Sequence, residues 1–215
     1  MPLSGLIVDW GGVLTVGMHE AMGSWAADES IDITAFIAVM REWLGTEYAL
    51  EAAYNPIHAL ERGELEVPAF EKHLAGALTD KTGQVVLAEG LLNRMFRFFA
   101  HSPDMMALVR RARANGIRTA LLSNSWGNNY PDDLFDGMFD EVVISGQVGM
   151  RKPDAEIYHH TIQAIGLSAP ECAFVDDLLP NVLAARELGL VGIHHTDYPT
   201  TASELDILFD RVLSR

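Results

Sequence analysis

The feature that most constrains the fold is the stretch from residue 3 to residue 15, LSGLIVDWGGVLT. In it, Leu6, Ile7 and Val8 form a short apolar run that ends at Asp9, and a pair of glycines follows. Such a run, closed by glycine, is typical of a strand buried on both faces of a parallel sheet. Ligands of these sheets bind beyond the carboxyl ends of the strands, which makes Asp9 a candidate functional carboxylate. The alternative is an aspartate in an ordinary turn, and this stretch alone favours neither.

The second half of the chain alternates between strand-like and helix-like segments. Strand-like apolar runs occupy residues 117–122, 141–144, 173–175 and 190–193. Helical periodicity covers residues 102–114, 155–165, 181–188 and 203–213, with a polar loop over residues 145–154. Strands that alternate with helices of this length predict an α/β fold with a doubly wound, Rossmann-like parallel sheet.

The part between residues 16 and 100 has a different pattern. Five segments repeat their apolar residues near the helical period, at residues 18–28, 34–44, 48–62, 68–78 and 85–99. No strand pattern interrupts them. We therefore expect an all-helical insert directly after the first strand.

Composition excludes several classes of function. The chain carries 15 Lys and Arg residues against 30 Asp and Glu residues, a formal net charge of −15. Nucleic acids and anionic membrane surfaces both need a basic footprint, so neither is an expected partner. A single cysteine, Cys172, permits no internal disulfide, and no basic leader or membrane-length apolar stretch occurs. We expect a soluble, cytoplasmic protein.

Polar residues follow the predicted strands at what would be one edge of the sheet. Asp9 follows the first strand, Ser123 and Asn124 follow the next, Lys152 lies in a later loop, and Asp176 and Asp177 follow a further strand. Carboxylates that share a small site repel one another and favour an oxygen-seeking cation, most plausibly Mg²⁺. A carboxylate nucleophile, a metal and a lysine together suit phosphoryl transfer.

Four segments resemble, in order, the four motifs of the haloacid dehalogenase (HAD)-type hydrolase superfamily. The sequences of the last three segments are similar to those of the branch that contains sugar phosphatases and the N-terminal domains of epoxide hydrolases. The resemblance runs from Leu3 to about Gly192, apart from the helical segment, which stands where this family inserts its cap. It implies a core of residues 1–15 and 101–215 and a helical cap of residues 16–100. The segments are LIVDWGGVLT (6–15), ALLSNS (120–125), GMRKPDAEIYHH (149–160) and CAFVDDLLPN (172–181).

The resemblance implies a role for each matching residue. Asp9 would be the nucleophile and a Mg²⁺ ligand, together with Asp177 and the backbone carbonyl of Gly11. Lys152 would hold the nucleophile and the phosphate. Asp176 would pair with that lysine, and Asn181 stands where many relatives have a further acid. The implied catalytic residues are Asp9, Ser123 and Lys152. The implied phosphate-binding residues are Trp10, Gly11, Ser123, Asn124 and Lys152.

One position departs from the family pattern. Most phosphatases of this superfamily have, two residues after the nucleophile, an aspartate that serves as general acid and base, and this chain has Gly11. Proton transfer by such a group contributes about 10²–10⁴-fold to the rate. The insert offers five unranked substitutes, which are His19, Glu20, Glu47, Glu51 and His58.

The resemblance implies a Mg²⁺-dependent phosphomonoesterase for a small phosphorylated metabolite such as a sugar phosphate. A metal-independent 2-haloacid dehalogenase is an alternative, although Asp176 and Asp177 favour a metal site. A non-catalytic binding module is another, suggested by Gly11. Trp126 and Asn128 are candidate rim residues or loop packing. Arg151 is expected to be a solvated loop charge, and the alternative is that it reaches the substrate. The sequence does not indicate the oligomeric state.

Overall fold

The computed structural model describes residues 3–44, 55–127, 130 and 132–214. Its centre is a parallel sheet of five strands in the order β3-β2-β1-β4-β5. This order confirms the predicted doubly wound α/β fold. The strands are β1 (Gly5–Val8), β2 (Arg118–Ser123), β3 (Glu141–Ile144), β4 (Cys172–Asp176) and β5 (Val191–His194).

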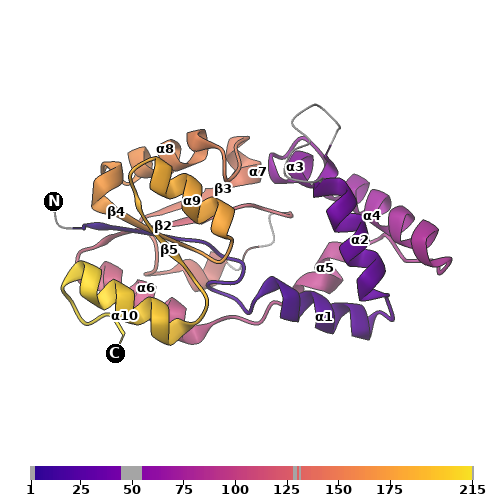
Figure 1. Cartoon of the computed structure of the whole chain (residues 1–215), viewed down its shortest axis with the longest axis horizontal. Coiled ribbons are helices and arrows are strands. Elements are labelled where there is room, and N and C mark those ends of the chain that lie inside the picture. The colour runs from indigo at the N-terminus through magenta and orange to yellow at the C-terminus, as the bar shows by residue number, and fades with distance from the viewer. Residues whose placement is uncertain (1–2, 45–54, 128–129, 131, 215) are drawn as a thin grey trace.

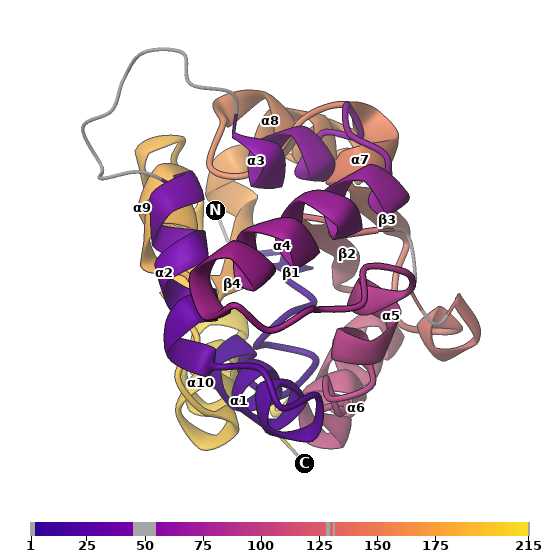
Figure 2. The same ribbon diagram turned by 90° about the vertical axis from the view of Figure 1, so that its right-hand side faces the viewer.

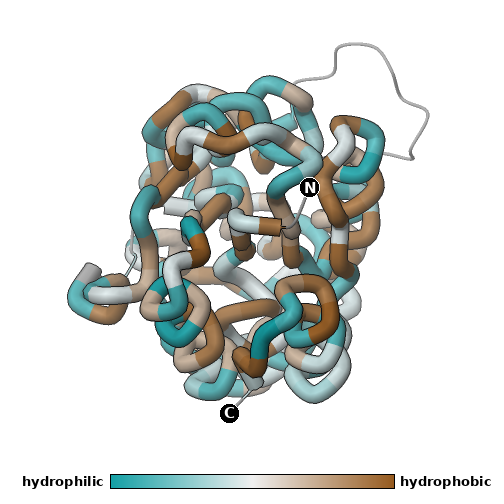
Figure 3. The backbone as a smooth tube through the Cα atoms, turned by 90° about the vertical axis from the view of Figure 1, so that its left-hand side faces the viewer, coloured by the Kyte–Doolittle hydropathy of each residue, from teal (hydrophilic) through white to brown (hydrophobic). Residues whose placement is uncertain are grey.

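Helices cover both faces of the sheet because its strands are apolar on both faces. Leu6 and Val8 pack into one core cluster, whereas Ile7 between them packs into the other. The helices α6 (Pro103–Ala114) and α10 (Tyr198–Phe209) lie on the first face, and α8 (Ala155–Ala164) and α9 (Leu179–Glu187) lie on the second (Figure 1). Around the sheet the backbone carries both hydrophilic and hydrophobic residues (Figure 3).

The helical insert (residues 16–100) forms a second layer of structure beyond the carboxyl edge of the sheet (Figures 1 and 2). It has its own apolar core, in which Trp25, Phe36 and Phe70 are buried. The two chain segments that join it to the sheet run side by side, with Thr15 bridged to His101. The division of the chain into a core and a cap at this point stays a prediction. The described helices are α1 (Met18–Asp28), α2 (Ile33–Leu44), α3 (Pro56–Glu61), α4 (Val67–Thr82) and α5 (Leu91–Phe96).

Three predicted segments differ in the structure. The helix expected over residues 85–99 is only α5, because Gly90 adopts a left-handed φ of 69° and the buried carboxylate of Glu71 accepts the backbone N–H groups of Gly90 and Leu92. The last helix begins earlier than expected, where the Asp197 side chain caps it through Thr200 N. The loop expected over residues 145–154 starts with a short helix, α7 (Ser145–Val148).

Of the remaining segments, the helix expected over residues 48–62 lies partly outside the described residues, and the rest of it is α3. Short 3-10 turns occupy Asp132–Phe135 and Ala169–Glu171. Among the described residues, no helix has the length and apolar character needed to cross a membrane.

Candidate active site

The chain turns sharply after β1 and brings Asp9 to the edge of the sheet. The backbone N–H of Asp9 donates to the Val175 carbonyl at 2.9 Å, and the side chain is nearly buried. Gly12 has a φ of 73°, and a Cβ atom at this position would lie 2.1 Å from Asp177 Oδ2. Only glycine therefore allows the turn after Asp9 to pass so close to Asp177.

Lys152 lies between two carboxylates in the interior. Its Nζ atom is 2.9 Å from Asp9 Oδ1 and 2.6 Å from Asp176 Oδ2, and the residue is 1% exposed. The side chain of Asn124 accepts from the Lys152 backbone N–H at 2.8 Å and donates to the Lys152 carbonyl at 2.9 Å. The Asn124 amide therefore positions the lysine, and both of its polar groups are engaged in doing so.

The Asp176 carboxylate is held on several sides. Besides Lys152, it accepts from the backbone N–H of Leu178 at 2.8 Å and from Asn181 Nδ2 at 3.1 Å. In turn, Tyr158 donates from its hydroxyl to the Asn181 carbonyl at 2.9 Å. Asp176 and Asn181 thus orient Lys152, which in turn faces Asp9.

The three aspartates could hold a divalent cation. One ligand oxygen from each of Asp9, Asp176 and Asp177 lies within 4.8 Å of the others. Three carboxylates against the single ammonium group of Lys152 leave an excess of two negative charges, which matches Mg²⁺. Because Asp176 is already held by its neighbours, Asp9 and Asp177 would be the side-chain ligands. The donor set consists of oxygen atoms and fits Mg²⁺.

The same crowding of charge changes the protonation of the site. Burial, followed by the nearby charges of Asp176 and Asp177, raises the pKa of Asp9 to about 7, although Lys152 opposes this. Burial and the charge of Asp176 raise the pKa of Asp177 to about 6. The attraction of Asp176 and Asp9 keeps the pKa of Lys152 above its ordinary value despite its burial. A bound cation would return both Asp9 and Asp177 to their ionised forms.

Ser123 ends β2 beside this cluster and is bound by a residue that sequence reasoning missed. The Tyr130 hydroxyl donates to Ser123 Oγ at 2.8 Å, and burial raises the pKa of Tyr130 to about 12. Trp10 lines the same cavity as Asp9, and its ring lies edge-on against His101 and Phe135 at centroid distances of 5.6 and 5.4 Å. Only the spacing of Tyr130 after Ser123 could have suggested its role.

A cavity of about 170 Å³ opens between the aspartates and the helical insert. Asp9, Ser123, Lys152 and Asp177 line its core end. Gly11 also lines it, and a Cβ atom at this position would meet no other atom within 4 Å. The place where most relatives carry an acid is therefore open space.

None of the expected substitutes for that acid that fall within the described residues lines the cavity. His19 and Glu20 are exposed, His58 does not line the cavity, and Glu47 and Glu51 lie outside the described residues. Besides the aspartates and Lys152, the titratable side chains that line the cavity are Glu61, His101 and Tyr130.

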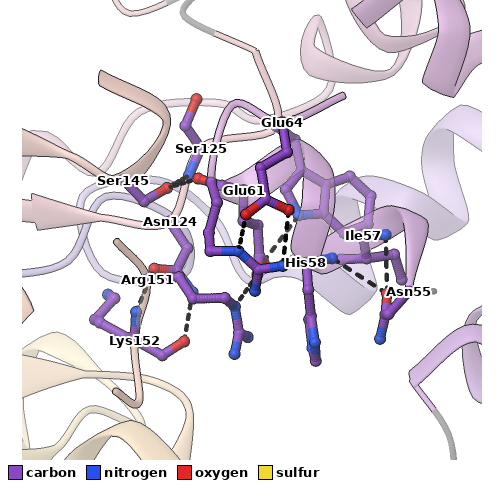
Figure 4. Close-up of polar contacts among 12 residues, drawn as sticks. Asn55, Ile57, His58, Glu61, Glu64, Asn124, Ser125, Ser145, Arg151 and Lys152 are labelled. Carbon is purple, nitrogen blue, oxygen red and sulfur yellow. Dashed lines mark hydrogen bonds and ion pairs between the residues drawn. The ribbon is translucent and has the colours of Figure 1, made fainter. Parts of the chain in front are cut away.

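Glu61, at the end of α3, joins the insert to the core (Figure 4). Its carboxylate lies 2.6 Å from Arg151 Nε and accepts from Trp126 Nε1 at 3.2 Å. Its carbonyl accepts from Ser145 Oγ at 2.6 Å. The expectation that Arg151 is a solvated charge is wrong, because its side chain is only 14% exposed in this ion pair. Trp126 does reach the cavity, whereas Asn128 lies outside the described residues.

Comparison with known proteins identifies relatives of this arrangement. The model of the haloacid dehalogenase-like hydrolase family matches residues 3–189. The chain is 41% identical to a sesquiterpene phosphatase of Aspergillus oryzae over 48% of its own length and 56% of the relative's. It is 32% identical to bifunctional epoxide hydrolase 2 of Mus musculus over 74% of its length, which is 32% of that protein. The chain thus spans about half or less of these curated relatives.

Solved structures share the fold. A HAD family enzyme of Bacteroides thetaiotaomicron, in complex with magnesium and inorganic phosphate, superposes with a TM-score of 0.62 at 18% identity. The match covers 90% of this chain and 94% of that one. With the family match over most of its length, the chain belongs to the haloacid dehalogenase-like hydrolase family.

Proposed function

We propose that this hydrolase is a Mg²⁺-dependent phosphomonoesterase that acts on a small phosphorylated metabolite through an aspartyl-phosphate on Asp9. The observation that carries the proposal is the buried pair of Asp9 and Lys152 at the end of a cavity, within a cluster that has two negative charges in excess. A phosphatase among the relatives and a structural neighbour with magnesium and phosphate support this class of reaction.

In the first step, a carboxylate oxygen of Asp9 attacks phosphorus, the bond from phosphorus to the alcohol oxygen breaks, and that oxygen takes a proton from water as the alcohol leaves. Water then cleaves the acyl phosphate, which releases inorganic phosphate and restores Asp9. Lys152 and the Ser123 hydroxyl would bind the phosphoryl oxygens, and Asp176 and Asn181 would keep Lys152 in place. Mg²⁺, held by Asp9, Asp177 and the predicted Gly11 carbonyl, would supply positive charge next to the transferred group.

The helical insert would serve as the cap of this site. It covers the cavity from the side opposite the sheet and contributes Glu61 and several apolar side chains to its wall. Opening would admit the substrate and closure would exclude water during transfer. Asn124, predicted to bind phosphate, would act by positioning Lys152 instead.

Dehalogenation uses an aspartate nucleophile without a metal, and Gly11 is compatible with it. The position of Asp177 close to Asp9 favours the metal-dependent reaction. Without a cation, the charge of Asp177 helps to raise the pKa of Asp9 and so lowers the fraction of Asp9 that is ionised and able to attack. Burial of Lys152 between Asp9 and Asp176 costs free energy, because three charged groups lose their hydration. A non-catalytic binding module would have no need for this arrangement.

Release of phosphate from a panel of phosphate monoesters tests the proposal. Wild type should release phosphate only with Mg²⁺, and Asp9→Asn should lose activity at least a thousandfold because the amide is not a nucleophile. Asp104→Asn removes an exposed carboxylate at the start of α6 and should match wild type. If Asp9→Asn retains wild-type turnover, or if no ester is hydrolysed, the proposal is wrong.

A further inference from the structure

We infer that the alcohol half of the substrate is apolar, so that the enzyme is built for phosphate monoesters of a short hydrophobic chain or ring rather than of a sugar. The inference rests on the proposed function and narrows its substrate class. The inference is based on the difference in polarity between the two ends of the cavity, because polar side chains line the end at the core and apolar side chains line the end at the insert.

The end of the cavity that faces the helical insert is built of apolar side chains. Two methionines of α1, two residues of α5 and a phenylalanine just after α5 line it, together with Trp126 from the core. Methionine adapts to irregular shapes, and aromatic rings offer large apolar surfaces. This wall suits an apolar group of variable shape. The residues from the insert are Met18, Met22, Met95, Phe96 and Phe99.

Glu61 and Tyr130, two of the polar side chains near this wall, already form hydrogen bonds within the protein. The carboxylate of Glu61 is bound by Arg151 and Trp126, and the Tyr130 hydroxyl donates to Ser123. His101 packs edge-on against the ring of Trp10. Sugar hydroxyls would lose their hydration here and compete with these existing contacts for partners, which disfavours a sugar.

Size and charge narrow the class further. The cavity of about 170 Å³ must hold the phosphate at its core end as well as the alcohol group, since Asp9, Lys152 and the apolar wall all line it. It therefore suits a ring or a short chain, and longer tails would extend towards solvent. A second anionic group would meet a chain with a net charge of −15. One phosphate on a neutral, apolar body is the best match.

A series of n-alkyl phosphates tests this inference. With Mg²⁺, we expect kcat/KM to rise from ethyl through butyl to hexyl phosphate, by up to about fourfold for each methylene group that becomes buried, and to level off at octyl phosphate, whose tail extends towards solvent. Glycerol 3-phosphate and glucose 6-phosphate should be at least tenfold poorer than hexyl phosphate. A flat series, or a preference for the polyol esters, overturns the inference while leaving the phosphatase reaction intact. If none of these esters is hydrolysed, that result contradicts the proposed function itself.

Two matched variants locate the effect at the wall. Met18 lines the cavity and is 37% exposed, so Met18→Gln keeps the length of the side chain at little risk to folding. It should lower the ratio of kcat/KM for octyl over ethyl phosphate at least threefold. Leu87→Gln makes a similar change at a site in the insert that is 65% exposed and away from the cavity, and should leave the ratio unchanged. An unchanged ratio in Met18→Gln overturns the inference.

Discussion

The ion pair of Glu61 and Arg151 should fasten the helical insert to the core, and the chain contains its own control. Three residues after Glu61, Glu64 forms a similar pair with Arg62, at 2.7 Å against 2.6 Å. The two pairs differ in burial. The side chains of Glu61 and Arg151 are 9% and 14% exposed, whereas those of Glu64 and Arg62 are 56% and 32% exposed. The variants Glu61→Gln and Glu64→Gln therefore compare the same chemical change in two environments.

The expected difference follows from that burial. Removal of one partner from a fully buried ion pair costs about 3–5 kcal/mol, and a hydrogen bond to a charged group contributes about 1.5–3 kcal/mol. Glutamine keeps an acceptor for Trp126 but leaves the charge of Arg151 without its counterion. We expect Glu61→Gln to lower the free energy of unfolding by about 2–3 kcal/mol. Glu64→Gln should have no measurable effect, because solvent screens an exposed pair.

Urea denaturation followed by circular dichroism measures this difference. A lower midpoint at an unchanged slope in Glu61→Gln reports a loss of stability rather than a change in the surface exposed on unfolding. Raising the salt concentration should affect the Glu61 pair little, since buried pairs are weakly screened. If the two variants unfold alike, the insert is not fastened to the core through Glu61, and the reasoning from burial is refuted.

Further predictions concern the two glycines and the aspartates. Gly11→Asp should fold normally, because its Cβ meets no atom within 4 Å, and should raise kcat for alkyl phosphates at least tenfold by supplying an acid; steady-state kinetics with an unchanged kcat would show that another group supplies the proton. Gly12→Ala should lower the melting temperature and weaken Mg²⁺ binding measured by calorimetry, since its Cβ would collide with Asp177; wild-type values would contradict the assigned turn. Without Mg²⁺, raising the pH from 5 to 8 should lower the melting temperature more in wild type than in Asp177→Asn. The reason is that Asp9 and Asp177 release protons in the folded state near pH 7 and 6 but near 3.8 when unfolded, so their contribution to stability is lost as the pH rises. Equal slopes in the two proteins would contradict this, and added Mg²⁺ should stabilise wild type more at pH 8 than at pH 5.

Much of the fold could be predicted because its determinants are local. The apolar run of β1 is four residues long, its two faces alternate, and glycine or polar residues mark where each strand ends. The strand ends in turn define an edge, so the neighbourhood of Asp9, Ser123, Lys152 and Asp177 follows from a parallel sheet. The resemblance to the HAD motifs names the same residues independently.

Other features depend on contacts between segments far apart in the chain. The helix α5 is shorter than its periodicity suggests because Glu71, from another helix, caps it at Gly90 and Leu92. The role predicted for Asn124 also changes. Its side-chain amide forms hydrogen bonds with the backbone of Lys152 and therefore positions that residue. Neither pairing leaves a local signal, since each joins residues about twenty or more positions apart.

By itself, the sequence determined the parallel sheet, the helical insert after β1 and the set of reactive groups at the sheet edge, because strand period and strand ends are local properties of the chain. Only the tertiary structure decided which of these groups are free to meet a substrate and what forms the opposite wall of the cavity. Glu61 and Arg151 are ninety residues apart in sequence and 2.6 Å apart in space. The packing of the insert against the sheet brings them together, and that packing depends on whole surfaces rather than on any single motif.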